Sequence, residues 1–369
     1  MKVLAWPGCE APETNPYSRL LYRHLQRVGG HVRVGEFSTR QFFADDWDLW
    51  HVHWPEALLH APSAARAAIE TLHFVAMVTV ARLRGIRIVW TIHDLESHSR
   101  RRPRLEAWFK RWFIPRLDGA IALTPGGAAA ARARYPALRD KPVAVIPHGH
   151  YMDVYPNEVS RSRARERLGI GAQERVLLFF GSVRPYKNVL HLIRVFRQLD
   201  ADQLRLVVAG CPESAALGDE VGAACAADGR IIPVLRRIGE EEVQYFFNAA
   251  DLVVLPFQEI LNSGSALLAL SFQRPVLVPA RGAMPELRER VGESAVIMYD
   301  GDLTAATLKA ALAGIEIAPP DPAGLTARLR ELLDWDGIAV DTLRFYDTVL
   351  GNRGAVAAAD RARGRMSSR

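Results

Sequence analysis

Residues Val176–Phe196 read Val-Leu-Leu-Phe-Phe-Gly-Ser-Val-Arg-Pro-Tyr-Lys-Asn-Val-Leu-His-Leu-Ile-Arg-Val-Phe. The first five residues are apolar and predict a buried strand. After Asn188 the apolar residues recur every three or four positions, as one packed face of a helix requires. Between these two runs, Gly181 opens a short loop that carries Arg184 and Lys187. The stretch therefore predicts a strand, a polar loop and a helix, which is the repeating unit of a parallel α/β sheet.

The same alternation of short apolar runs and longer helical patterns recurs along the whole chain. It predicts an α/β protein with two Rossmann-like, doubly wound sheets of similar size. The expected strands are Lys2–Trp6, Val32–Glu36, Leu49–His53, Ile88–Ile92, Gly119–Leu123, Val143–Ile146, Val176–Phe180, Leu204–Ala209, Ile231–Val234, Leu252–Leu255, Val276–Val278 and Ala295–Met298.

The boundary between the two domains is expected between Tyr151 and Glu174, because this segment contains a charged run and no clear strand. We therefore predict an N-terminal domain over 1–155 and a C-terminal domain over 156–335. A last helix over 336–352 is expected to pack back toward the N-terminal domain. The arginine-rich stretch 353–369 lacks apolar periodicity and predicts a disordered basic tail.

Composition limits the class of protein. The 369 residues are 49% hydrophobic, enough for a large core, and the three cysteines show no disulfide or metal-ligand spacing. The net charge of +6 is concentrated in 99–116 and in the tail, so the remainder is mildly acidic, unlike a general nucleic-acid binder. The first strand runs directly into a polar loop, and the apolar run Thr71–Ala81 is about half of a bilayer span. These features predict a cytoplasmic protein that does not cross the membrane and does not bind nucleic acid.

Two segments together predict a site for a diphosphate. Arg184 and Lys187 follow a strand end, where α/β sheets bind ligands, and arginine and lysine suit phosphate oxygens in complementary ways. About 75 residues later, 262–265 read Asn-Ser-Gly-Ser immediately before an uncharged apolar helix. The free N–H groups at a helix start bind anions, although a plain N-cap by Ser263 or Ser265 would explain the same residues.

Six motifs in this order resemble the glycosyltransferase B-fold family, and within it the β-mannosyltransferases of xanthan-type exopolysaccharide assembly. They are Asn15–Tyr17, His51–Glu56, Thr91–His93, His148–Tyr151, Arg184–Lys187 and Asn262–Gly264. The resemblance implies two domains facing a cleft, with the C-terminal domain binding a nucleotide sugar and the N-terminal domain binding an acceptor. It further implies GDP-mannose as the donor and a polyprenyl-diphosphate-linked oligosaccharide as the acceptor.

The resemblance also implies roles for individual residues on the donor side. The predicted donor-binding residues are Gly181, Arg184, Lys187, Phe257, Glu259, Asn262, Ser263, Gly264 and Ser265. Many retaining relatives carry two glutamates with seven residues between them here, whereas this chain has Leu267 and Leu268 where the second should stand. The missing carboxylate favours an inverting enzyme and leaves Glu259 as a candidate for the ribose.

An inverting transferase needs a general base for the acceptor hydroxyl. We predict Glu56, which follows the strand Leu49–His53, with Asp94 as the second candidate. Two histidines in His148-Gly-His150 make a poor metal site. The resemblance instead implies that this loop lies against the donor sugar or its phosphates, where His148 would neutralise leaving-group charge. We therefore expect no metal and no cofactor. The predicted acceptor-binding residues are Asn15, Tyr17, His53, Trp54, His93, His150 and Tyr151.

The basic stretch 99–116 has two interpretations. Leu105, Trp108, Phe109, Trp112 and Phe113 are expected on one face of a helix and Arg104, Lys110 and Arg111 toward the other. Such a helix can lie in the headgroup layer of an anionic membrane, which would make the protein peripheral on the inner face of the cell membrane. Alternatively, the aromatic face packs on the sheet beneath a solvated cationic face.

The function predicted from the sequence is therefore an inverting, metal-independent hexosyltransferase of glycan biosynthesis. The alternatives are a retaining transferase that uses a UDP-sugar or another nucleotide sugar, and a sugar-nucleotide epimerase of related fold. The donor base, the sugar, the acceptor hydroxyl and the oligomeric state are left open by the sequence.

Overall fold

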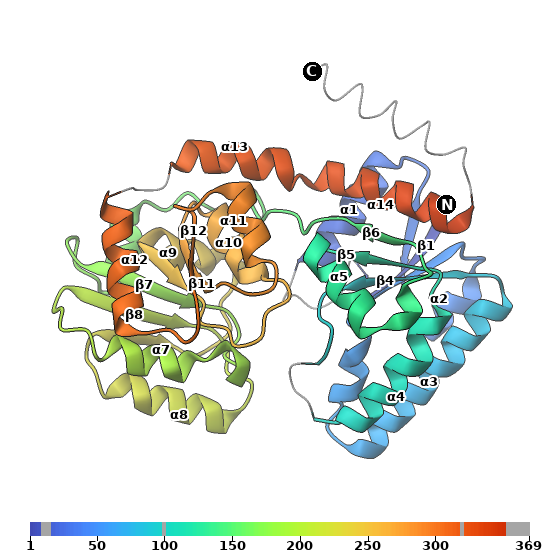
Figure 1. Ribbon diagram of the computed structural model, residues 1–369, viewed down its shortest axis with the longest axis horizontal. Helices are drawn as coiled ribbons and strands as arrows, with labels where there is room; N and C mark the ends of the chain where they lie inside the picture. Colours follow the sequence, from blue (N-terminus) through green and yellow to red (C-terminus); the bar gives the residue numbers. More distant parts are fainter. Residues whose placement is uncertain (9–15, 98–100, 318–320, 352–369) are drawn as a thin grey trace. The chain divides into compact units, whose positions relative to one another are not determined.

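The computed structural model describes residues 1–8, 16–97, 101–317 and 321–351 (Figure 1). The chain forms two compact units. Unit 1 comprises Met1–Gly149 and the chain from Leu333 onward, and unit 2 comprises His150–Leu332. The chain thus leaves unit 1 six residues before the predicted boundary at 155 and re-enters it at Leu333.

Unit 1 is built on a six-stranded parallel sheet in the order β2-β1-β3-β4-β5-β6. Its strands are β1 (Lys2–Trp6), β2 (Arg33–Glu36), β3 (Leu49–His53), β4 (Arg87–Ile92), β5 (Gly119–Ala122) and β6 (Val143–Val145). Its helices are α1 (Tyr17–Val28), α2 (Thr39–Ala44), η1 (Pro55–His60), α3 (Ala64–Leu83), α4 (Pro103–Phe113), η2 (Ile114–Arg116), α5 (Pro125–Arg134), η3 (Pro136–Leu138) and α14 (Trp335–Leu350).

Alternate residues of these strands face two different helix layers. Val3, Leu49 and Val89 pack with residues of α1 and α14 in one core cluster. On the opposite face, the Trp50 ring lies 5.2 Å from the ring of Phe74 in α3, and the Trp90 ring lies 6.4 Å from a ring of α4. The sheet is therefore buried on both faces, as an all-parallel sheet requires.

The C-terminal helix α14 packs on α1 in unit 1. His24 Nδ1 lies 2.7 Å from Asp336 Oδ1, and the Nε–H of Arg27 donates to the same oxygen at 3.1 Å. Tyr346 and Trp335 of α14 are buried in the cluster beneath α1. The basic tail predicted over 353–369 lies outside the described residues.

Unit 2 has a second six-stranded parallel sheet in the order β12-β11-β10-β7-β8-β9. Its strands are β7 (Arg175–Phe180), β8 (Leu204–Ala209), β9 (Ile231–Val234), β10 (Leu252–Val254), β11 (Val276–Pro279) and β12 (Val296–Tyr299). Its helices are α6 (Arg161–Arg167), η4 (Pro185–Lys187), α7 (Val189–Phe196), α8 (Ala215–Ala226), η5 (Glu240–Glu242), α9 (Val243–Ala249), α10 (Gly264–Ser271), α11 (Met284–Val291), α12 (Ala305–Ile317) and α13 (Pro322–Leu332).

The predicted strands are all confirmed, with ends that differ by one residue at most. The acidic run after Gly239 forms the short 3-10 helix η5, and the α-helix α9 begins only at Val243.

Helix α3 is longer than the apolar run Thr71–Ala81 on which the sequence prediction relied. Within the described part of the chain, it is the one helix long and apolar enough to cross a membrane by length and composition. Phe74 on its inner face packs on the sheet of unit 1, and a helix that covers a sheet passes the same test of length and composition. This finding alone is weak evidence for a membrane span.

Candidate active site

The two segments predicted to bind a diphosphate meet at Gly181, directly after β7. A Cβ atom placed on Gly181 would lie 3.0 Å from Lys187 Nζ and 3.1 Å from Ser265 Oγ. Gly181 has a φ of 129°, which side chains rarely adopt, so both the backbone and the crowding favour glycine. The structure therefore brings an ammonium and a hydroxyl from two distant segments to one strand end.

The environment of Lys187 suits a bound anion. The side chain is 8% exposed, and burial, assisted by the neighbouring Arg184, lowers its pKa to about 8. Its Nζ lies 5.2 Å from the centre of the Phe257 ring, and the N–H of Gln258 donates to Tyr186 O at 2.8 Å. No ion pair joins Lys187 or Arg184 to a carboxylate within residues 1–8, 16–97, 101–317 and 321–351. Two cations without a carboxylate partner form a site where a negative ligand gains the most.

Helix α10 begins where the sequence predicts an anion-binding turn. Ser263 is the N-cap, and its Oγ accepts from the N–H of Ala266 at 3.1 Å. Asn262, Gly264 and Ser265 are half-buried around this turn. Ser263 is thus an ordinary N-cap, while the helix start still points its remaining N–H groups away from the helix.

The sequence assigned His150 and Tyr151 to the acceptor side, but both belong to unit 2. The N–H of Tyr151 donates to Ser271 Oγ at 2.9 Å. Its hydroxyl lies close enough to Gly264 that a Cβ there would stand 3.2 Å away. The chain crosses between the units before His150, and Tyr151 contacts both ends of α10. The predicted contact of His150 and Tyr151 with the acceptor stays a prediction.

Two further predicted donor residues differ in exposure. Phe257 is buried against Lys187, as its ring contact requires. Glu259 is exposed in the loop before α10. Leu267 and Leu268, which stand where the resemblance implies a second glutamate in retaining enzymes, are both buried.

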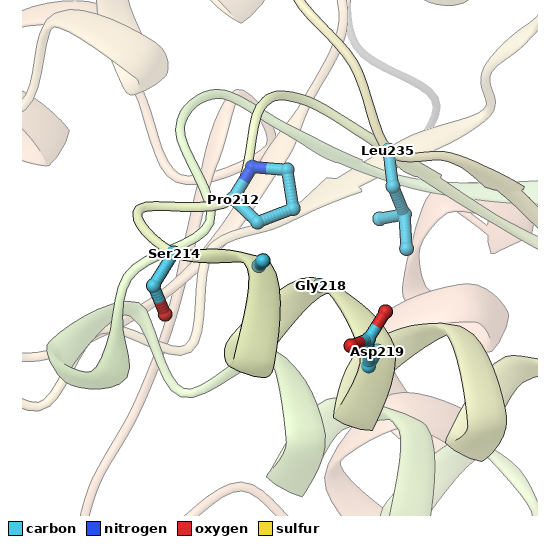
Figure 2. Close-up of a pocket in the computed structure, with 6 residues that line it drawn as sticks. Pro212, Ser214, Gly218, Asp219 and Leu235 are labelled. Carbon is cyan, nitrogen blue, oxygen red and sulfur yellow. The ribbon is translucent and has the colours of Figure 1, made fainter.

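A pocket of about 350 Å³ lies at the loops that follow β8 and β9 (Figure 2). It is lined by Pro212, Ser214, Ala215, Gly218, Asp219 and Leu235, which follow β8 and β9 at the carboxyl edge of the sheet. The loop after β8, which lines this pocket, contacts the loop after β7. Val183 forms a β-bridge with Pro212, and Val183 O accepts a hydrogen bond from the N–H of Glu213 at 3.0 Å. The sequence prediction missed this cavity, since no motif marks its lining.

In unit 1, the loop after β3 presents Glu56. Trp54 has a φ of 43° and ends the strand, and Glu56 follows in η1. Glu56 is 6% exposed, and burial raises the pKa of its carboxyl group to about 7. A carboxyl group with this pKa can accept a proton near neutral pH, which suits a general base.

Buried histidines of β3 and β4 form a hydrogen-bonded chain. Tyr22 O–H and His53 Nε2 are 2.8 Å apart, and His53 Nδ1 and His93 Nε2 are 3.0 Å apart. Burial lowers the pKa of His53 to about 3, and burial also holds the pKa of His93 well below its ordinary value. Both imidazoles are therefore neutral at physiological pH, and each can donate one hydrogen bond and accept another.

Tyr17 lies at the centre of an aromatic cluster that collects several predicted residues. Its ring centre is 4.9 Å from His93, 4.8 Å from His148 and 6.4 Å from Trp54. Tyr17 is 1% exposed, so the structure gives it a packing role, and its predicted contact with the acceptor stays a prediction. Trp54 stacks on His93 at 4.0 Å and 20°.

His148 and Asp94 complete the predicted catalytic set. Burial lowers the pKa of His148 to about 4, and its Nδ1 lies 2.7 Å from Gly149 O. Asp94 is half-buried directly after His93. Asn15 lies outside the described residues. The structure therefore gathers Glu56, Asp94, His93 and His148 at the carboxyl edge of β3, β4 and β6, although no described group of three side chains could hold a metal ion.

The prediction of one aromatic face on 99–116 is wrong for α4. Phe109 and Phe113 are buried, with ring centres 5.7 and 5.6 Å from Phe74. Trp108 is 46% exposed and shares the outward face with two exposed arginines, Arg104 and Arg111. The helix therefore packs on the sheet through its phenylalanines and presents one tryptophan among cations. Lys110, expected on the cationic face, is buried.

Several residues that support the site carry no local sequence signal. Tyr346 O–H lies 2.6 Å from His51 Nδ1, and His51 Nε2 lies 2.7 Å from Thr91 Oγ1. Tyr346 lies about 300 residues after His51 in the chain, a separation that no spacing rule covers. The apolar pattern of α14 predicts that one face of the helix is packed, but it does not predict that the Tyr346 hydroxyl contacts His51 in β3.

Family models of known proteins match both units. Residues 6–154 match Glycosyltransferase Family 4, and residues 174–334 match Glycosyl transferases group 1. Over 345 residues the chain is 32% identical to the GDP-mannose:glycolipid 4-beta-D-mannosyltransferase of Xanthomonas campestris pv. campestris, which covers 93% of this chain and 91% of that protein.

Two solved structures share the fold. HepE from Anabaena, in complex with UDP-glucose, superimposes with a TM-score of 0.70 at 16% identity, covering 93% of this chain and 99% of that chain. Sucrose-phosphate synthase from Thermosynechococcus elongatus gives a TM-score of 0.69 at 16% identity, covering 95% of this chain and 99% of that chain. At such identity the likeness concerns the fold, and it confirms the predicted pair of Rossmann-like sheets.

Proposed function

Because the chain belongs to the group 1 and family 4 glycosyltransferases, which have the glycosyltransferase B fold, we propose that it transfers mannose from GDP-mannose to a lipid-linked saccharide. The observation that carries the donor half of this proposal is the meeting of Lys187 and Ser265 at Gly181. The donor and acceptor follow the name of the relative that matches 93% of the chain.

The chemistry of the donor half is the stabilisation of a departing diphosphate. Bond cleavage at the anomeric carbon leaves negative charge on the diphosphate oxygens, and fixed donors in a dry site stabilise that charge strongly. Lys187 and Arg184 would supply positive charge, and the N–H groups at the start of α10 would supply hydrogen bonds. With these donors in place, we propose that the reaction requires no metal ion.

We further propose inversion at the anomeric carbon, with Glu56 as the base. Leu267 occupies the position at which retaining relatives hold a carboxylate, which supports an inverting route. An inverting displacement needs a base on the acceptor hydroxyl, and Glu56 has a pKa raised to about 7 by burial. Asp94, held directly after His93, is the second candidate.

We call Lys187 and Ser265, which meet at Gly181, together with Arg184, the clamp. The pocket lined by Pro212 and Asp219 is our proposed position for the nucleoside. Its volume of about 350 Å³ admits a nucleobase, and its loop is tied to the clamp through Val183 and Pro212. Asp219 supplies a carboxylate to its wall. A carboxylate only accepts hydrogen bonds. It therefore suits guanine, whose N1–H and amino group are two adjacent donors, better than uracil, whose single N–H donor lies between two carbonyl acceptors.

A thermal-shift panel of GDP, UDP and ADP tests the donor assignment. We expect GDP to raise the Tm most, because a ligand at 100 times its Kd stabilises the folded state by about 2.7 kcal/mol. For units of this size, that corresponds to a shift of roughly 5–10 °C. In Asp219→Asn the preference for GDP should disappear, whereas Asp302→Asn, also in unit 2 and exposed, should keep it. A larger response to UDP would overturn GDP-mannose and favour a UDP-sugar enzyme.

A lipid-linked acceptor also requires contact with a membrane, and we propose that unit 1 supplies it on the cytoplasmic side. Helix α4 lies beside α3 (Figure 1). On α4, Arg104, Trp108 and Arg111 share the exposed face, and α3 exposes Ile69 (66%) and Leu72 (59%). Arginine with exposed tryptophan and aliphatic side chains suits the headgroup layer of an anionic leaflet.

Co-sedimentation with vesicles tests this surface. The protein should bind vesicles that contain phosphatidylglycerol and should not bind pure phosphatidylcholine vesicles. Arg104→Glu with Arg111→Glu should weaken binding at least ~30-fold, since each arginine near an anionic surface contributes about 1 kcal/mol. The control Arg139→Glu with Lys309→Glu changes the net charge equally at other exposed positions. If both double variants lost vesicle binding equally, the exposed face of α4 would not be a specific membrane-binding surface.

A further inference from the structure

The inner face of α4 holds the loop that follows β4. Lys110 Nζ donates to Leu95 O at 2.5 Å and to Glu106 Oε1 at 2.6 Å, and the same carboxylate oxygen accepts from the N–H of Ser97 at 2.7 Å. Lys110 is 5% exposed and Glu106 is 8% exposed, so the ion pair is buried and both members are hydrogen-bonded. Because Asp94 directly precedes Leu95, the pair fixes the backbone from which Asp94 projects.

The same helix reaches the loop that follows β3. Arg102, the N-cap residue of α4, donates to Leu59 O in η1, which is the element that carries Glu56. Tyr135, at the end of α5, donates its hydroxyl to Leu95 O. Helix α4 therefore connects the two loops that carry the candidate bases.

Charges on this helix also act on Glu56. Burial raises the pKa of Glu56 most, a backbone hydrogen bond lowers it, and the charge of Lys110 lowers it further; Glu106 and, from the loop after β4, Asp94 raise it. Lys110 in turn faces Tyr135, Glu106 and Glu56, which together outweigh its burial and raise the pKa of its ammonium group. Lys110 therefore stays positively charged at neutral pH, and its charge favours the ionised form of Glu56.

We propose that Lys110 and Glu106 are a positioning pair for acceptor activation: they hold the 94–97 loop in place and set the charge that Glu56 faces. Neither residue needs to touch the substrate. The inference rests on the proposed role of Glu56 as base. A buried pair of this kind adds little stability on its own, because desolvation offsets the attraction, so its position beside the site points to a role in function.

Opposite shifts in two pH profiles test the pair. Lys110→Met removes a positive charge, so the pKa of Glu56 should rise and the acid limb of kcat/KM should move to higher pH by roughly one unit. Glu106→Gln removes a negative charge, so the limb should move to lower pH. The KM for the donor should change little in both variants, because the proposed donor residues belong to unit 2. Lys110→Arg keeps the charge and should keep the limb in place.

Lys141→Met is the matched control. Lys141 is a half-buried lysine of unit 1 whose Nζ donates to Leu117 O at 2.5 Å, so its loss also breaks a bond from an ammonium to a loop carbonyl. It should lower the Tm without moving the limb. A limb that stays fixed in Lys110→Met, or shifts of the same sign in Lys110→Met and Glu106→Gln, would overturn the pair.

Titration of the Glu56 carboxyl carbon by NMR, with Glu56→Gln for assignment, separates the pair from the base assignment. If the pKa of Glu56 shifts in opposite directions in the two variants and the acid limb of kcat/KM shifts with it, both the positioning pair and Glu56 as the base are supported. If the pKa of Glu56 shifts in opposite directions in the two variants but the acid limb of kcat/KM does not move, the pair controls the pKa of Glu56, and Glu56 is not the base. A pKa that moves in neither variant refutes the pair, whatever the kinetics show.

Discussion

Lys187→Met is expected to lower kcat/KM by about 10²- to 10³-fold, the usual effect of removing one donor to a developing negative charge in a dry site. The loss should appear mainly in kcat, because the charge on the leaving diphosphate grows in the transition state. Methionine keeps the length and apolar stem of lysine, so the contact with Phe257 can persist. Steady-state kinetics with GDP-mannose measure the effect.

The same substitution should make the protein more stable at pH 7. Burial lowers the pKa of Lys187 to about 8, below its ordinary value of 10.5, so the unfolded chain binds this proton more tightly. The folded state is therefore penalised at any pH below about 8, by up to about 3 kcal/mol, and the penalty fades as the pH rises toward 10.5. Denaturant titrations at pH 7 and pH 10 should show a gain that shrinks with pH.

Lys309→Met provides the comparison, because Lys309 is an exposed lysine of the same unit. It should change neither kcat/KM nor stability by more than a small amount. If Lys187→Met kept full activity, the clamp at Gly181 would lose its proposed role. If it lost both activity and stability, Lys187 would be a structural residue.

The strands, and the meeting of the loop after β7 with the start of α10, were predictable because their signals are local. The apolar run before Gly181 specifies β7, and parallel strands end at one edge, so cations placed there meet the next loops of the same edge. The start of α10 followed from Ser263, whose side chain caps the helix as expected. Local residue chemistry and the geometry of a parallel sheet were therefore enough to predict that the loop after β7 and the start of α10 lie together.

The side-chain arrangement in unit 1 depends on contacts between distant segments, which the sequence could not supply. The exposed tryptophan of α4 was expected beside Phe109, yet the fold buries Phe109 against Phe74 of α3 and turns Trp108 outward. Likewise Lys110 pairs with Glu106 one turn earlier, but its bond to Leu95 O depends on how α4 packs. Periodicity identifies a buried face, and only the packed structure says what that face holds.

Glu56→Gln is expected to lower kcat by about 10²- to 10⁴-fold, the usual contribution of a general base. In the native enzyme, kcat/KM should rise tenfold per pH unit until about pH 7, because the carboxyl group must be ionised to accept a proton. That acid limb should vanish in Glu56→Gln. Asp94→Asn is the competing variant, and a lost limb there with an intact limb in Glu56→Gln would make Asp94 the base.

Stability distinguishes a base from a structural carboxylate at the same position. Burial raises the pKa of Glu56 from 4.5 to about 7, so the folded state binds this proton more tightly than the unfolded chain does. Stability is then unaffected below pH 4.5 and falls as the pH rises toward 7, by up to about 3 kcal/mol. Glutamine carries no ionisable group, so Glu56→Gln should be more stable than the native enzyme at pH 8 and nearly equal at pH 4.5. A variant that gains stability while it loses turnover identifies a residue kept for chemistry, because a carboxylate kept for folding would lose both.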